Sequence, residues 1–372
     1  MGDMKLKNPF LTRGYAGSDY FCDRENETRK LIAAFENDRD VTLIAPRRFG
    51  KTGLIHHTFS RLPGEFTGIY LDIFSTRDLS EFSAAFATAV IGALDTKVEA
   101  AMSSVARFFK SCRPTVTPQE DGMPKFSFDV VPSNAEATLK EAFAYLKSKE
   151  RRVVIALDEF QQIGEYPEQG VEALLRSHIQ LLPFVRFVFA GSRKHMMEEM
   201  FVSPRRPFYQ STQILSLREI PCMSYAAFAR GFFDGAGLPF DAELFSEVYR
   251  RFGGITWYVQ ATLNRIWEAG GGLSDVAQID AAIDSLVEDQ ALVFHDLLRS
   301  QSEGSQTMLR AIARAGVVPQ PSSGKFVATS GFRAASSAAF ALNDLRRRDL
   351  VYETDAGLVV YDRLFGLWLK RN

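Results

Sequence analysis

The 372-residue chain contains few cysteines and histidines, and this scarcity excludes several kinds of site. Its three cysteines, Cys22, Cys112 and Cys222, are scattered, and none stands in a C-x-x-C pair or at a spacing typical of a metal site. A zinc-binding module and a disulfide framework are therefore not indicated. Such sparse cysteine usage is typical of proteins kept in a reducing compartment.

Long apolar runs and an excess of charge of one sign are also missing. No apolar stretch approaches the ~20 residues that span a bilayer, and the N-terminal residues lack the apolar core of a signal peptide. The formal net charge is −1 and 46% of the residues are hydrophobic. These values argue against a disordered chain and against a strongly basic nucleic-acid binder. We expect a soluble, cytoplasmic protein of two or three domains.

The most informative segment that is present is a short apolar run followed by a basic loop. Val41–Ile44 predicts a buried strand, and the next eight residues have the spacing [GA]-x-x-x-x-G-K-[ST]. The loop consists of Ala45, Pro46, Arg47, Arg48, Phe49, Gly50, Lys51 and Thr52. A strand, this loop and a following helix predict a phosphate-binding P-loop. The alternative is an ordinary basic turn.

Each chemical feature of the loop suits a nucleoside triphosphate. Backbone N–H groups and the helix N-terminus favour phosphate, and Gly50 lets the backbone approach it closely. Lys51 is expected to reach the β- and γ-phosphates, and the Thr52 hydroxyl is expected to hold Mg²⁺. The first motif position is Ala45 rather than glycine, and its methyl group is tolerable if φ is negative there.

A second apolar run ends in two acids. Val153–Leu157 reads as a strand buried on both faces, and Asp158 and Glu159 follow it directly. Because ligands bind at the carboxyl ends of parallel strands, this pattern predicts a Walker B motif. Asp158 would hold Mg²⁺ through water, and Glu159 would act as the general base. The alternative is a strand that stops at a solvated acidic turn.

A third strand-like run, Phe184–Arg193, ends in small and polar residues. In P-loop ATPases of the additional-strand type, a polar residue at this strand end senses the γ-phosphate, and Ser192 is the candidate here. Strands that alternate with helices over this half of the chain predict a parallel α/β sheet covered on both faces. The expected fold is a P-loop NTPase of the ASCE type.

The organisation along the chain predicts three domains. Residues 1–215 would form the ATPase core, with a β-hairpin insertion near 113–131 turning at Asp121-Gly122. Residues 216–300 lack strand patterns and read as a helical lid, while residues 301–372 read as a winged helix. Acids outnumber bases from 216 to 300 and bases outnumber acids from 301 onward, which supports a boundary near residue 300.

The last segment predicts helices followed by two short strands around an Asp355–Gly357 turn. The strong helix of this segment ends in three consecutive arginines. Arg333, Arg346, Arg347 and Arg348 could contact DNA phosphates. Alternatively, the arginines form a solvated helix end that complements the helix dipole, and a winged helix can also bind protein.

Taken together, these residues resemble the archaeal-type ATPase family within the STAND branch of the AAA+-related P-loop ATPases. The resemblance covers nearly the whole chain. It rests on Phe21–Glu25, Ala45–Thr52, Leu157–Gln161, Ala190–Ser192, Gly253–Tyr258 and Tyr361–Trp368. Members usually have glycine at the position of Ala45 and often have proline at the position of Arg363. They usually have proline at the position of Thr256, where the lid helix contacts nucleotide, so this chain departs from the family pattern at that contact.

The resemblance implies an ATPase core, a helical lid and a winged helix that act as a nucleotide-gated switch. The box that contains Arg24 would line the adenine pocket. Arg206 lies where such proteins can carry an arginine that reaches a γ-phosphate, in cis or from a neighbouring subunit of a homo-oligomer. ATP is favoured over GTP because the chain has no Asn-Lys-x-Asp motif.

We therefore expect a protein that hydrolyses ATP to ADP and phosphate with Mg²⁺. One rival is a DNA-associated ATPase that uses the winged helix, which would bind duplex in a salt-dependent way. A second rival is a signalling scaffold that holds nucleotide without hydrolysing it.

Overall fold

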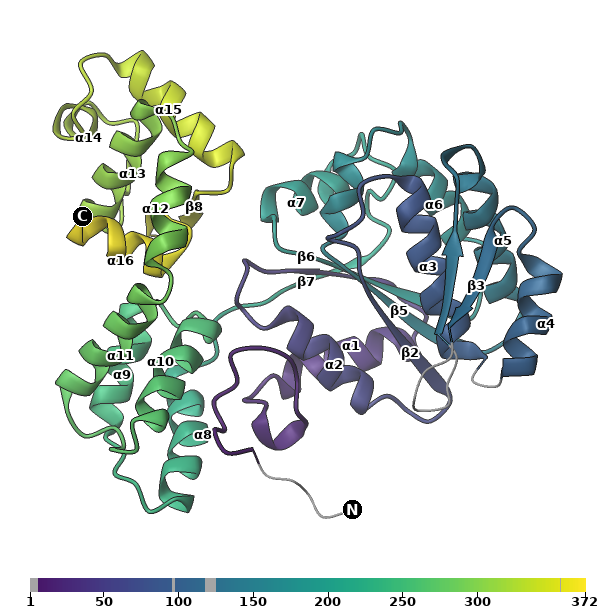
Figure 1. Ribbon diagram of the computed structural model, residues 1–372, viewed down its shortest axis with the longest axis horizontal. Helices are drawn as coiled ribbons and strands as arrows, with labels where there is room; N and C mark the ends of the chain where they lie inside the picture. The colour runs from purple at the N-terminus through teal and green to yellow at the C-terminus, as the bar shows by residue number, and fades with distance from the viewer. Residues whose placement is uncertain (1–5, 96–97, 118–124, 355) are drawn as a thin grey trace. The chain divides into compact units, whose positions relative to one another are not determined.

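The computed structural model describes residues 6–95, 98–117, 125–354 and 356–372 and separates the chain into two units (Figure 1). The first, called here the N-terminal unit, is Arg13–Ile220. The second, called the C-terminal unit, is Pro221–Asn372 together with the residues up to Thr12. The chain therefore passes between the units twice. The three-domain division is a finer proposal, in which the lid and the winged helix would both lie in the C-terminal unit.

A five-stranded parallel sheet forms the centre of the N-terminal unit. Its strands are β1 (Val41–Ile44), β2 (Phe66–Asp72), β5 (Arg152–Asp158), β6 (Val185–Gly191) and β7 (Gln213–Ser216). They lie in the order β2-β5-β6-β1-β7. Because Ile44 pairs with Gly191 and Asp72 pairs with Asp158, the strands end at the same edge. The predicted α/β fold is confirmed, and that edge is where the sequence motifs converge.

Helices cover both faces of this sheet (Figure 1). On one face lie α1 (Glu25–Glu36) and α2 (Lys51–Ser60), and on the other α3 (Leu79–Leu94), α5 (Ala135–Ser148) and α6 (Val171–Ile179). Alternate β5 residues Val153, Ile155 and Leu157 join the core beneath α3 and α5. The residues between them point to the α2 face, since successive strand side chains alternate. Asp158 therefore points toward the P-loop helix.

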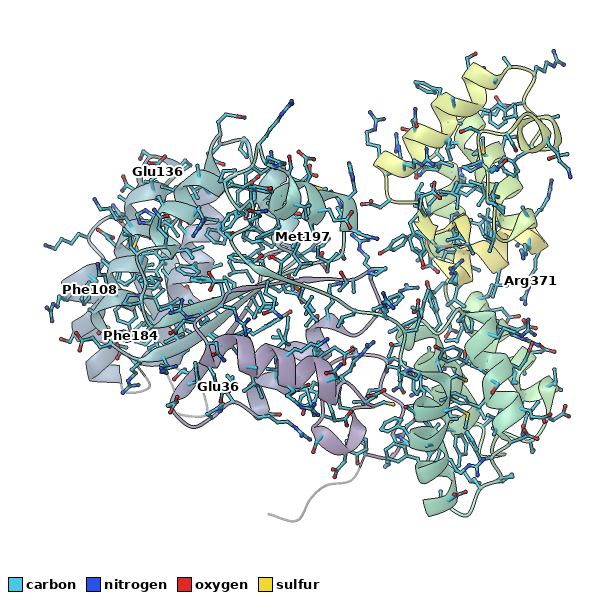
Figure 2. All side chains as sticks on the ribbon, turned by 180° about the vertical axis from the view of Figure 1, so that it is seen from behind. Glu36, Phe108, Glu136, Phe184, Met197 and Arg371 are labelled. Carbon is cyan, nitrogen blue, oxygen red and sulfur yellow. The ribbon has the colours of Figure 1, made fainter. Side chains whose placement is uncertain are left out.

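Side chains fill the layers of this unit, with Met197 of α7 (Lys194–Val202) inside and Glu36 and Glu136 at the surface (Figure 2). Helix α4 (Val98–Phe108) and the antiparallel pair β3 (Arg113–Thr117) and β4 (Lys125–Asp129) follow α3. The pair falls where the hairpin insertion was predicted. The proposed Asp121-Gly122 turn lies outside the described residues.

The C-terminal unit begins with five helices and the N-terminal stretch of the chain. The helices are α8 (Cys222–Gly235), α9 (Ala242–Arg251), α10 (Thr256–Glu268), α11 (Val276–Glu288) and α12 (Ala291–Arg299). Phe10 is fully buried and packs on Phe233, with ring centroids 5.4 Å apart. The Trp267 indole N–H donates to the Lys7 carbonyl at 2.9 Å. These contacts fix residues near the N-terminus on α8 and α10 of the C-terminal unit.

The winged helix follows in the same unit. The elements from residue 301 onward, where the winged helix was predicted, are α13 (Glu303–Ala315), α14 (Gly324–Thr329), α15 (Ala335–Arg347), β8 (Val351–Thr354), β9 (Gly357–Val360) and α16 (Arg363–Arg371). Strands β8 and β9 pair antiparallel, and Asp355 of the predicted turn lies outside the described residues. The buried Tyr258 hydroxyl of α10 donates to Asp362 at 3.2 Å and accepts from the Arg363 N–H at 2.9 Å. This contact joins α10 to the N-terminus of α16.

Candidate functional site

The P-loop lies at the end of β1, where the strand leaves the sheet. The Ala45 N–H still donates to the Gly191 carbonyl, at 3.5 Å. Arg48 has a φ of 71° and Gly50 a φ of 87° before α2 begins at Lys51. Left-handed residues in such a loop are the backbone pattern of anion-binding concavities. Ala45 does not take a positive φ, so its methyl group is compatible with the first position of the motif.

Lys51 is only 6% exposed, and the loop itself holds its ammonium group. The Nζ atom donates to the Ala45 carbonyl at 3.0 Å and to the Pro46 carbonyl at 3.4 Å. Burial lowers the pKa of Lys51, and the charges of Glu159 and Asp158 act in the opposite direction. The two acceptors of Nζ are neutral carbonyl oxygens, and a phosphate oxygen would be a stronger, charged acceptor for this buried cation.

Asp158 meets the P-loop through Thr52. The Thr52 hydroxyl donates to Asp158 Oδ2 at 2.7 Å, while Asp158 Oδ1 accepts from the Glu159 N–H at 3.0 Å. The Asp158 side chain is 3% exposed. The two residues predicted to hold Mg²⁺ thus lie together, although they are 106 positions apart in the chain.

This donor set fits a magnesium ion held together with phosphates. Hydroxyl and carboxylate oxygens are hard ligands, and Mg²⁺ is usually bound through one or two carboxylates and substrate phosphate rather than by an all-protein cage. No group of three or more His, Cys, Asp or Glu residues that could hold a metal ion occurs among the described residues. The chemistry of Thr52 and Asp158 therefore matches a site completed by the nucleotide.

A further donor to Asp158 comes from β2. The Tyr70 hydroxyl donates to the same oxygen, Oδ2, at 2.9 Å. Burial and the charge of Asp158 raise the pKa of Tyr70 well above its usual range. The sequence motifs did not single out Tyr70, because its contact with Asp158 depends on the pairing of β2 with β5.

Glu159 is held at the end of β5 in a left-handed conformation, with a φ of 55°. The Ser192 hydroxyl donates to Glu159 Oε2 at 2.7 Å, and the Gln161 side-chain amide donates to the same oxygen at 2.5 Å. The predicted base and the predicted γ-phosphate sensor are therefore in direct contact. Gln161, which is 3% exposed, was missed as a site residue, and its place two positions after Glu159 was the available signal.

Gly191 makes this cluster possible. A Cβ atom added at Gly191 would lie 2.5 Å from Gln161 Oε1 and 2.4 Å from Met197 Sδ. Any other residue there would displace Gln161 or Met197. The glycine of the Ala190–Ser192 segment is thus explained by close packing.

The other predicted nucleotide contacts have different environments. Phe49 is buried, whereas Arg47 is exposed and Arg48 half-buried. Arg24 is 4% exposed, and its Nη1 donates to Glu27 Oε1 at 2.9 Å. Its Nη2 is buried and has no hydrogen-bond partner, so the guanidinium retains an unused donor.

Arg206 is held by acidic residues of its own unit. Its Nη2 lies 2.5 Å from Glu172 Oε1 of α6, and its Nη1 lies 3.8 Å from Glu199 Oε1 of α7. The structure therefore places Arg206 in an ion-pair cluster, separate from the Thr52, Asp158, Glu159 and Ser192 contacts.

The arginines proposed for DNA lie in the winged helix. Arg333 is exposed just before α15. Arg346 pairs with Glu353 at 2.5 Å, and Asp344 accepts from Arg347 at 2.7 Å and from Arg348 at 3.1 Å. The three arginines at the end of α15 are solvent-accessible, but each already has a carboxylate partner.

Two family models match the chain. A model of an ATPase domain predominantly from Archaea matches residues 21–261, and a model of a probable winged helix domain matches residues 292–371. A search of the curated proteins finds no match. None of the helices in the described part of the chain is long and apolar enough to cross a membrane.

Solved structures with the same fold cover almost the whole chain. A Walker-type ATPase of Pyrococcus abyssi has a TM-score of 0.67 at 17% identity, covering 97% of this chain and 99% of its own. The Aeropyrum pernix ORC2 protein, in ADPNP–ADP complexes, has a TM-score of 0.60 at 17% identity, covering 97% and 96%. The Aeropyrum pernix ORC1 protein in complex with DNA has a TM-score of 0.52 at 14% identity, covering 95% and 93%.

These structures establish the fold, and the ATPase model establishes the family. Its match includes the P-loop, the two acids at the end of β5 and the end of β6. Since it extends over more than half of the 372 residues, the chain belongs to the family of ATPase domains found predominantly in Archaea.

Proposed function

We propose that this protein hydrolyses ATP to ADP and phosphate with Mg²⁺. The observation that carries the proposal is the 2.7 Å hydrogen bond between Thr52 of the P-loop and Asp158 of β5, with Glu159 next in the chain. It supports the proposal because it brings the loop that would bind phosphate against the carboxylate that would hold the metal, with the proposed base one residue further along the chain.

Lys51 and Thr52 would bind the substrate. Lys51 Nζ would exchange its hydrogen bonds to the carbonyls of Ala45 and Pro46 for hydrogen bonds to phosphate oxygens. Their negative charge would stabilise the buried ammonium group. Thr52 and Asp158 would hold Mg²⁺, which neutralises charge on the β- and γ-phosphates. Backbone N–H groups of the loop would donate to the phosphate oxygens of the nucleotide. Arg47, Arg48 and Phe49 flank those contacts, and Arg24 would offer its unused donor near the adenine.

Glu159 would accept the proton of the attacking water. As the water oxygen bonds to the γ-phosphorus, the bond to the bridging β–γ oxygen breaks and ADP leaves with that electron pair. Glu159 Oε2 already accepts from Ser192 and Gln161, so the proton would go to Oε2 after one of these donors is released, or to the other oxygen, Oε1. A γ-phosphate that draws the Ser192 hydroxyl away would release one of these two donors. Arg206 would contribute only after its ion pair with Glu172 opens, toward its own nucleotide or that of a neighbouring subunit.

The same contacts support a nucleotide-gated switch of the STAND type. A switch requires ATP to bind two conformations with different affinity. The Glu159–Ser192 contact is the proposed sensor, because it joins the proposed base to the strand end that would face the γ-phosphate. If ATP binds without turnover, the protein would instead hold nucleotide as a non-hydrolysing scaffold.

Phosphate release from ATP by the purified full-length chain tests the proposal. We expect turnover with Mg²⁺, none in EDTA and none in Lys51→Ala, with Lys30→Ala as a control at an exposed lysine of α1. Nucleotide binding is measured in parallel by titration calorimetry. Binding without turnover would favour the scaffold, and the absence of both would overturn the proposal.

A DNA-associated role is the second candidate, favoured by the exposed arginines of α15 and by the DNA complex of the structurally similar ORC1 protein. Arg347 and Arg250 form a matched pair: their side chains are 77% and 75% exposed, and each bonds an acid three residues earlier. We expect Arg347→Ala to weaken duplex binding and to reduce its salt slope by about 1, whereas Arg250→Ala leaves both unchanged. Fluorescence anisotropy measures both. Equal effects of the two substitutions would contradict DNA binding through α15.

A further inference from the structure

Tyr70 lies on β2, beside the strand that carries Asp158. It pairs with Ala156, so Asp158 is its diagonal neighbour two residues further along β5. Residues in this relation share one face of a sheet and are within reach of a long side chain. The Tyr70 hydroxyl uses this reach, because it donates to Asp158 Oδ2 at 2.9 Å.

The carboxylate of Asp158 is thus oriented from three directions. Oδ2 accepts from Thr52 and Tyr70, and Oδ1 accepts from the Glu159 N–H. Thr52 belongs to the loop that would take up phosphate and metal, so its contacts change with ligand. Tyr70 belongs to the sheet and would remain in place. The sheet therefore supplies a side-chain donor that can hold the carboxylate plane fixed while the loop binds nucleotide.

The ring of Tyr70 has a separate packing role. It lies against His56 of α2, with ring centroids 4.6 Å apart. Phenylalanine would keep this contact and remove only the hydroxyl. The two roles of the side chain can therefore be separated by one conservative substitution.

We infer that Tyr70 is a positioning residue for the magnesium carboxylate, acting through Asp158. This inference rests on the proposed function, since it assigns Asp158 to Mg²⁺. Groups that hydrogen-bond a metal ligand from outside fix its orientation, and their loss typically weakens metal binding about 10- to 100-fold.

The test is the Mg²⁺ dependence of AMP-PNP binding, measured by titration calorimetry on the full chain. In Tyr70→Phe we expect the Mg²⁺ concentration at half-maximal enhancement of affinity to rise about tenfold. Affinity for AMP-PNP in EDTA should change much less, because Lys51 and the loop backbone provide the proposed phosphate contacts. Circular dichroism checks that the variant is folded.

Tyr145→Phe is the matched control. The Tyr145 hydroxyl donates to Asp95 Oδ2 at 2.9 Å, the same distance as in the Tyr70 pair, away from the P-loop. It should leave the Mg²⁺ midpoint unchanged. In an Asp158→Ala background, Tyr70→Phe should have no further effect, because the partner through which it acts is gone.

The outcomes separate the inference from the proposed function. An unchanged Mg²⁺ midpoint in a folded Tyr70→Phe protein, or an equal shift in Tyr145→Phe, would overturn the inference and leave ATP binding intact. A shift that persists in the Asp158→Ala background would also overturn it. If the wild-type chain showed no Mg²⁺-dependent binding of AMP-PNP, the proposed function would fail and the inference with it.

Discussion

At the scale of single residues, Glu159 is the residue on which the proposed hydrolysis depends. Its backbone is left-handed, and one oxygen of its carboxylate accepts from both Ser192 and Gln161. A non-glycine residue in this conformation costs of order 1–3 kcal/mol, and such residues cluster at functional sites. The structure thus combines an uncommon backbone conformation with a carboxylate that faces the P-loop edge of the sheet.

Glu159→Gln should separate nucleotide binding from hydrolysis. The amide keeps the size of the side chain but cannot take a proton from water, so we expect turnover to fall by about 10²–10⁴-fold. AMP-PNP affinity should stay within about twofold, because Lys51 and the loop backbone provide the phosphate contacts. Phosphate release and titration calorimetry measure the two quantities. Glu165→Gln, at an exposed acid that pairs with Arg193, is the control, and wild-type turnover in Glu159→Gln would exclude Glu159 as the base.

At the scale of elements, strands and their ends were predictable, whereas contacts across the sheet were not. The apolar runs that became β1, β5 and β6 carry β-branched and aromatic residues and end in the motif residues, so periodicity and chemistry agree. Tyr70 had no such signal, because its role comes from the pairing of β2 with β5. Helices α4 and α14 were missed. Helix α14 spans only six residues after a loop rich in glycine, serine and proline, which is too short for a periodic pattern.

Helix α3 offers an element-scale test with a pH dependence. Its N-cap Asp78 accepts from the Glu81 N–H at 2.8 Å and from the Ser80 hydroxyl at 2.6 Å. These hydrogen bonds, the Ser80 hydroxyl first, hold the pKa of Asp78 below its usual value. A lowered carboxylate pKa contributes stability above the unfolded pKa near 3.9 and loses it as the pH falls through the folded pKa.

We therefore expect Asp78→Ala to lower the free energy of unfolding by about 1 kcal/mol at pH 7. The difference from wild type should shrink as the pH falls from about 3.9, where the carboxyl takes up a proton in the unfolded chain, through the lower pKa of the folded protein. Urea unfolding followed by circular dichroism measures this difference in the free energy of unfolding. Asp78→Asn keeps an accepting oxygen and should stay near wild type at pH 7. A cost of Asp78→Ala that is the same at pH 7 and at pH 3 would contradict the capping role.

At the scale of the whole molecule, the proposed switch requires that nucleotide binding in the N-terminal unit change the conformation of the C-terminal unit. The P-loop and its partners belong to the N-terminal unit, and the winged helix belongs to the C-terminal unit. The chain links them after Thr12 and after Ile220. Within the C-terminal unit, Tyr258 joins α10 to α16 through Asp362. A displacement of α10 would therefore be transmitted to the winged helix.

The distribution of tryptophan makes this coupling measurable without a label. All three tryptophans, Trp257, Trp267 and Trp368, lie in the C-terminal unit, so emission excited selectively from tryptophan reports on that unit. If nucleotide gates the molecule, AMP-PNP with Mg²⁺ should change the emission, and ADP should give a different end point, because the two ligands favour different conformations. Lys51→Ala, which removes the phosphate contact, should abolish both changes. If calorimetry detects AMP-PNP binding but the emission is unaltered, nucleotide is held without reorganising the lid or the winged helix. The proposed switch would then be overturned, whereas the proposed hydrolysis would not be.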